Sequence, residues 1–192
     1  MGKDRLAAFS DGVIAIIITI MVLELKLPHG ANWATLMGAG PHFLSYVLSF
    51  TYLAIYWNNH HHLFHTVTRV DGLMLWANCH LLFWLSLIPA ATAWMGENFL
   101  APIPTASYGG VLLLSAIAYY VLQKAILRKH GSHSLLAVAL GNDIKGKISP
   151  MLYLAGIALA FVSPWFSISI YMLVAVIWLV PDRRIEKAIR ES

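Results

Sequence analysis

A carboxylate and a hydroxyl stand near the start of an apolar segment that is long enough to span a lipid bilayer. Asp11 follows Ser10 directly, and both come shortly after Arg5 and Phe9. An ionisable group at membrane depth costs about 2.5–3.5 kcal/mol on insertion scales, so it usually marks function or a buried polar network. Three roles are therefore open for Asp11: packing against polar groups of neighbouring helices, proton relay, and direct contact with an ion.

The segment after Asp11 carries an apolar stripe. At roughly 100° per residue, four of its residues lie within about 100° of one another on a helix; they are Ile16, Thr19, Ile20 and Leu23. Asp11 projects about 140° away from this face. Most apolar stripes pack against neighbouring helices, and Thr is common at such interfaces. The pattern alone does not distinguish helix packing from the lining of a pore.

Histidines form a second polar cluster, made of His60, His61, His62 and His65. Imidazoles at i and i+4 share a helix face and can share a metal, as in the histidine boxes of membrane di-iron oxygenases. Such enzymes need several boxes together with carboxylates at ligand spacing, and these are missing here. We therefore expect hydrogen-bonding histidines and no resident metal. His80, near Asn78 and Trp76, is expected to be a buried group with its hydrogen bonds satisfied.

Composition places these residues in a membrane protein. Of 192 residues, 59% are hydrophobic and only 11% are charged, which excludes a soluble domain. The length suits one all-α membrane domain, residues 1–192. The net charge of +4 does not indicate a nucleic-acid partner, because the basic residues stand at the ends of apolar stretches. Cys79 is the only cysteine, so disulfides within the chain and Cys-rich metal sites are excluded.

Six membrane spans are predicted from the need for about 20 apolar residues per crossing. The stretch 148–180 is about 50 Å long as one helix, too long for a hydrocarbon core of roughly 30 Å, so we divide it at Ser163-Pro164-Trp165. The other spans lie near 4–25, 42–66, 72–94 and 107–127. With six spans, Lys26 alone among the 13 Lys and Arg residues falls on the second side. The positive-inside rule then places both termini in the cytoplasm, and the charged tail Pro181–Ser192 is expected to form an interfacial helix.

The order Arg5-x-x-x-Phe9-Ser10-Asp11 resembles the signature of one family, the endolysosomal potassium channel called transmembrane protein 175 and its prokaryotic relatives. The pair His60-His61 with the following Phe64, the chain length and the span count resemble that family as well. The resemblance implies an integral membrane channel that prefers potassium over sodium and is not an enzyme. It also implies that single six-helix units assemble as homotetramers in the plasma (inner) membrane of a prokaryote.

In this family, helix 1 lines the central pore and large apolar residues form its constriction. The resemblance places that constriction at Ile16, followed by Thr19 or Ile20 and then by Leu23. No Thr-Val-Gly-Tyr-Gly filter loop is present, so selectivity from stacked carbonyl rings is not expected. The implied partners are further copies of the chain, membrane lipid, potassium and other monovalent cations. No cofactor is expected beyond the permeant ion.

Asp11 and Ser10 are expected to brace helix 1 against the second and third spans, through His60, Trp76, Asn78 or His80. Arg5 is expected at the cytoplasmic interface. Three other functions remain as alternatives to a potassium channel. The first is a proton-coupled or proton-conducting transporter that uses Asp11 and the intramembrane histidines. The second is a metal-dependent membrane enzyme, and the third is a purely structural membrane protein.

Overall fold

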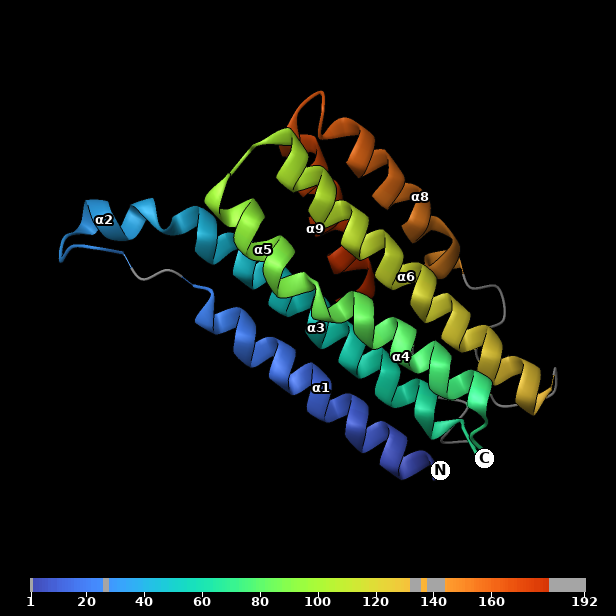
Figure 1. Ribbon diagram of the computed structural model, residues 1–192. Helices are drawn as coiled ribbons and strands as arrows, with labels where there is room; N and C mark the ends of the chain where they lie inside the picture. Colours follow the sequence, from blue (N-terminus) through green and yellow to red (C-terminus); the bar gives the residue numbers. More distant parts are fainter. Residues whose placement is uncertain (1, 26–27, 132–135, 138–143, 180–192) are drawn as a thin grey trace.

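The computed structural model describes residues 2–25, 28–131, 136–137 and 144–179, and within them it contains helices and turns but no strand (Figure 1). This confirms the all-α prediction. The helices are α1 (Lys3–Leu23), α2 (Trp33–Gly38), α3 (Gly40–His65), α4 (Gly72–Ser86), α5 (Ile88–Glu97), α6 (Pro102–His130), α8 (Ile144–Leu159) and α9 (Pro164–Leu179). The predicted tail helix Pro181–Ser192 and Lys26 lie outside the described residues.

Three helical stretches in the described residues are long and apolar enough to cross a membrane: Lys3–Leu23, Gly72–Glu97 and Pro102–His130. The helix Pro164–Leu179 is apolar but shorter. The predicted division of 148–180 is confirmed, because α8 ends at Leu159 and α9 begins at Pro164. Proline suits the first position of a helix, where its missing N–H would have no partner in any case.

The third predicted span is divided at a point where we expected a continuous helix. We expected one helix over 72–94, but α4 ends at Ser86 and α5 begins at Ile88. Pro89 explains the break, because it has no N–H to donate to the carbonyl four residues earlier. The Leu87 N–H instead closes a tighter turn on the Trp84 carbonyl at 3.2 Å. The short helix α2 was also not predicted; the Asn32 side chain caps it by accepting from the Thr35 N–H at 2.8 Å.

The helices pack as an antiparallel bundle with α1 along one edge and α8 along the other (Figure 1). Helix α1 contacts α3, α4 and α5, while α6 contacts α4, α5, α8 and α9. Helix α2 projects beyond the bundle and buries none of its side chains. The interior where α3, α6 and α9 meet contains large fully buried tyrosines: Tyr52, Tyr108 and Tyr171. Tyr52 donates to the Tyr171 carbonyl oxygen at 2.6 Å and so joins α3 to α9.

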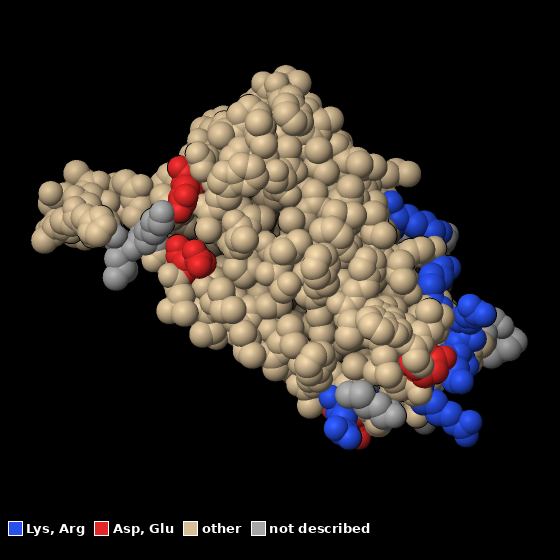
Figure 2. Space-filling view, viewed as in Figure 1, with Lys and Arg blue, Asp and Glu red and all other residues tan. Residues whose placement is uncertain are grey.

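Basic residues gather at one end of this bundle. Figure 2 shows Lys and Arg atoms at that end and a broad middle zone without charge. The described basic residues stand at the start of α1, between α3 and α4, at the end of α6 and at the start of α8: Lys3, Arg5, Arg69, Lys124, Arg128, Lys129, Lys145 and Lys147. Glu24 and Glu97, by contrast, stand at the ends of α1 and α5. The antiparallel order of the helices brings these positions to opposite ends.

Candidate functional site

Helix α1 presents two different faces to its surroundings. Its buried face packs against the bundle and consists of Leu6, Ser10, Ile14, Ile17 and Met21. The opposite face is apolar yet exposed: Ile16 is 59% exposed and Leu23 is 77% exposed. Ile20, at 45%, is less exposed. The predicted stripe therefore forms a surface of the single chain that its own bundle does not cover.

Thr19 lies on the same exposed face of α1. At roughly 100° per residue it points about 180° away from the middle of the buried face, whereas Ile20 points only about 80° away. The Thr19 hydroxyl donates to the Ala15 carbonyl oxygen at 2.9 Å. Its proton is thereby used within the helix, and the oxygen lone pairs remain available to accept from water or to coordinate a cation.

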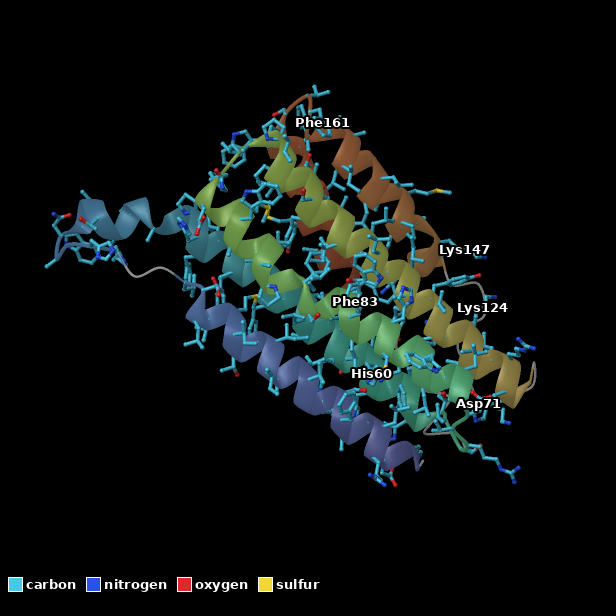
Figure 3. The ribbon with its side chains drawn as sticks, in the orientation of Figure 1. His60, Asp71, Phe83, Lys124, Lys147 and Phe161 are labelled. Carbon is cyan, nitrogen blue, oxygen red and sulfur yellow. The ribbon has the colours of Figure 1, made fainter. Side chains whose placement is uncertain are left out.

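A chain of polar side chains fixes the buried face of α1. Asn78 of α4 donates from Nδ2 to Ser10 Oγ at 2.9 Å, and its Oδ1 lies 2.8 Å from His60 Nε2 of α3. Ser10 itself donates to the Leu6 carbonyl oxygen. All three side chains are 0–1% exposed. Figure 3 shows His60 where α1, α3 and α4 come together.

Asp11 is held by a separate contact with α3. Trp57 donates from its indole Nε1 to Asp11 Oδ1 at 3.0 Å, and the Trp57 ring stacks on His61 with centroids 6.0 Å apart. Trp57 was not among the partners that we expected for Asp11. The sequence did contain a signal for this contact, because an indole N–H in an apolar membrane segment needs an acceptor. Trp57 also lies one helical turn before His61 on α3.

The remaining candidate residues lie outside these contacts. Trp76 is 78% exposed, and His80 accepts from Trp84 Nε1 at 2.9 Å on the exposed side of α4. Both stand two residues from Asn78, and residues at i and i±2 do not share a helix face. The expectation that His80 is buried is therefore wrong. Arg5 is exposed near the start of α1, and Phe9 is 52% exposed.

A groove of about 310 Å³ lies between the start of α1 and the end of α3. Its lining includes Lys3, Asp4 and Asp11 of α1 and His60, His61 and His65 of α3. His61 and His65 approach each other here, with Nε2 atoms 3.0 Å apart. In the described part of the chain, no group of three or more His, Cys, Asp or Glu side chains is arranged to hold a metal ion.

The site thus combines an uncovered apolar face of α1 with a polar anchor away from that face, formed by Ser10 and Asp11 and their hydrogen-bond partners on α3 and α4. An anchor of this kind holds α1 in a fixed orientation against the bundle. The uncovered face can then meet equivalent faces of further copies, or an ion path, without disturbing the packing inside the chain.

Comparison with known proteins gives consistent results. Residues 5–89 match the family model described as the endosomal/lysosomal potassium channel TMEM175. A protein named as a potassium channel from Chryseobacterium sp. (strain P1-3) is 56% identical over 192 residues, which is 100% of each chain. The endosomal/lysosomal proton channel TMEM175 of Gallus gallus is 34% identical over 103 residues, 47% of this chain and 21% of that protein.

A solved structure also resembles the whole bundle. The crystal structure of a lysosomal potassium-selective channel TMEM175 homolog from Chamaesiphon minutus superposes with a TM-score of 0.82 at 31% identity. The match covers 94% of this chain and 97% of that one. These relatives are ion channels rather than enzymes, and the long apolar helices are those of an integral membrane protein. The chain belongs to the TMEM175 family.

Proposed function

We propose that this protein is a potassium-selective cation channel, built as a homotetramer of six-span subunits in the plasma membrane of a prokaryote. Its pore is lined by α1, and its constriction is formed by apolar side chains of that helix. It has no filter loop of the Thr-Val-Gly-Tyr-Gly type and no resident cofactor. Potassium as the permeant ion is supported by the Chryseobacterium relative, which is named as a potassium channel, and by the Chamaesiphon homolog, which is described as potassium-selective.

The uncovered face of α1 is the observation that carries this proposal. A helix that packs against its own bundle on one side, and presents Ile16 and Leu23 on the other, is suited to surround an axis with its symmetry copies. Ile16 and Leu23 would form rings about 10 Å apart along that axis. Of the two neighbouring candidates, Thr19 points more directly away from the bundle than Ile20 does.

The closed and open states follow from this geometry. When the apolar rings are narrow they exclude water, and a cation that must lose its hydration meets a high barrier; gating by dewetting works in this way. When the rings widen, a partly hydrated cation passes, and four Thr19 oxygens replace some of the lost water ligands. Potassium holds its water less tightly than sodium, so partial dehydration favours potassium.

The topology that we propose has six spans with both termini in the cytoplasm. The spans are α1, α3, the α4–α5 pair, α6, α8 and α9. The gathering of the described Lys and Arg residues at one end of the bundle supports this orientation, because basic residues favour the cytoplasmic side (Figure 2). Helix α2 then lies at the opposite surface of the membrane.

Cation flux into proteoliposomes tests the proposal. We expect passive flux that prefers potassium over sodium, and we expect Ile16→Asn to increase it because an amide hydrates the constriction. Leu173→Asn is the matched control. Leu173 is 50% exposed on α9, which packs against α3, α6 and α8, and we expect unchanged flux. An intact Ile16→Asn tetramer with wild-type flux would contradict an apolar gate at this position.

A proton-conducting or proton-coupled transporter is the second candidate. It is favoured by the Asp11 carboxylate and the His60 imidazole, which line the same groove, and by the naming of the Gallus gallus relative as a proton channel. The same proteoliposomes distinguish the two functions. Potassium flux that persists when the pH is equal on both sides supports the channel, and flux that requires a pH difference supports the transporter.

A further inference from the structure

The contact between His61 and His65 is separate from the hydrogen bonds that hold α1 through Ser10 and Asp11. The two residues are one turn apart near the end of α3, and their Nε2 atoms lie 3.0 Å apart at an exposed position. In that hydrogen bond one ring donates an N–H and the other accepts with its lone pair. If both rings carry their proton on Nδ1 instead, both Nε2 atoms have a lone pair available for a cation, without any loss of protons.

The spacing of the two nitrogens suits a transition metal. Zinc–nitrogen bonds are about 2.0–2.1 Å long, so two imidazole ligands of a tetrahedral ion are about 3.3 Å apart. The observed separation is only a few tenths of an ångström shorter. Two histidines at i and i+4 on one helix face also supply zinc ligands in the His-Glu-x-x-His motif of metalloproteases.

The groove around the pair has mixed charge. Asp4 and Asp11 offer carboxylates that offset the charge of a cation, whereas Lys3 opposes it. His60 lines the same groove but is buried, and its Nε2 is held by Asn78. His62 touches only the edge of the His61 ring, at a centroid distance of 5.8 Å. The groove has room for the water molecules that would complete the coordination of an ion.

We propose that a divalent transition-metal ion, of which Zn²⁺ is the type, binds between His61 Nε2 and His65 Nε2 at the end of α3. Two imidazoles and water form its ligand set. The site is exchangeable, because it has two protein ligands and lies open to the groove. Mg²⁺ and Ca²⁺ are excluded by their preference for oxygen ligands.

The bound ion is linked to the orientation of α1. It fixes the His61 ring, on which Trp57 stacks, and Trp57 holds the Asp11 carboxylate of α1. The site thus joins the family signature to the end of α3. Binding of the ion does not depend on whether the protein conducts potassium.

Calorimetric titration of the tag-free protein in detergent with ZnCl₂ tests the proposal. We expect one ion per chain, and at least tenfold weaker binding in His61→Gln and in His65→Gln. His62→Gln is the matched control and should bind as the wild type does. Titration with MgCl₂ should give no binding.

A measurement on the wild type covers the case in which a variant does not fold. Diethyl pyrocarbonate modifies accessible histidines, and Zn²⁺ should protect His61 and His65 but leave the labelling of His62 unchanged, as read by mass spectrometry. Zinc binding that survives both substitutions, equal binding of Mg²⁺, an absence of binding by the wild type, or unprotected His61 and His65 would each overturn the proposal.

Discussion

Asn78 and Ser10 are joined by a hydrogen bond of 2.9 Å between two side chains that are both 0% exposed. The same Asn78 amide meets His60 Nε2 at 2.8 Å, so one residue of α4 ties α1 to α3. A buried polar group is expensive unless its hydrogen bonds are made. Here they are made between helices, and the polar chain therefore specifies how α1 is rotated against the bundle.

We predict that Asn78→Leu destabilises the protein. Leucine has a similarly branched but larger side chain, and it removes both contacts, leaving Ser10 Oγ and His60 Nε2 buried without this partner. Interhelical hydrogen bonds in membranes are worth about 1–2 kcal/mol in model peptides, and we expect a loss of this size. The measurement is the temperature at which the monodisperse peak is lost in detergent.

The control for this variant is Asn98→Leu. Asn98 donates to the Trp94 carbonyl oxygen at an exposed position, so its replacement leaves no buried group unpaired. We expect its thermal midpoint to stay close to that of the wild type. Equal midpoints for Asn78→Leu and Asn98→Leu would show that the buried chain does not stabilise the helix contacts.

For Asp11 we predict an effect on assembly rather than on selectivity. The carboxylate accepts from Trp57 and points away from the exposed stripe. Asp11→Ala removes the acceptor and should lower the tetramer fraction, measured by native mass spectrometry, while the potassium-to-sodium permeability ratio stays the same. Asp11→Asn keeps an oxygen for Trp57 and should assemble better than Asp11→Ala. Intact Asp11→Ala tetramers with an altered ratio would place Asp11 in the ion path instead.

Much of this architecture could be predicted from the sequence, because membrane spans have a minimum length and clear interruptions. The division between α8 and α9 follows from a stretch too long for one crossing and from Pro164. The break at Leu87 could not be predicted in the same way. Proline is tolerated inside many membrane helices, where neighbouring groups satisfy the freed carbonyl. Only the packed structure shows that the helix before Pro89 ends at Ser86.

The residues of the candidate site could be predicted more readily than the neighbours that they contact. The residues of the stripe follow from helical periodicity alone, and the structure leaves them exposed. Which neighbour meets Ser10 or Asp11 depends on how α3 and α4 are rotated, and the sequence left four residues open. Asn78 faces the interior of the bundle, whereas Trp76 and His80 face outward. Because α4 carries apolar residues on all sides, its hydrophobic pattern does not show which side faces inward.

Close packing around Tyr171 gives a prediction for two adjacent glycines of α6. A Cβ at Gly109 would overlap the Tyr171 hydroxyl and ring, whereas a Cβ at Gly110 meets nothing within 4 Å. Tyr171 is 0% exposed and also lies against Gly156, so it has no space to withdraw. Gly109→Ala should destabilise by about 1–3 kcal/mol, the usual cost of overpacking.

Gly110→Ala serves as the control for that variant. Both positions are helical and neighbouring, so alanine improves helix propensity in each by up to about 1 kcal/mol. We therefore expect Gly110→Ala to melt at the wild-type temperature or slightly above it. If Gly109→Ala melts as high as Gly110→Ala, the contact with Tyr171 is looser than the structure indicates.

The hydroxyl of Thr19 leads to a prediction about selectivity. Its proton is donated to the Ala15 carbonyl oxygen at 2.9 Å, which turns the oxygen lone pairs outward from α1. Thr19→Val preserves shape but removes that oxygen, so we expect the potassium-to-sodium permeability ratio to fall severalfold toward unity. Thr19→Ser retains the oxygen and should keep a ratio near that of the wild type. Bi-ionic reversal potentials measure both variants. If Thr19→Val kept the wild-type ratio in a conducting channel, selectivity would have to arise from the apolar rings alone.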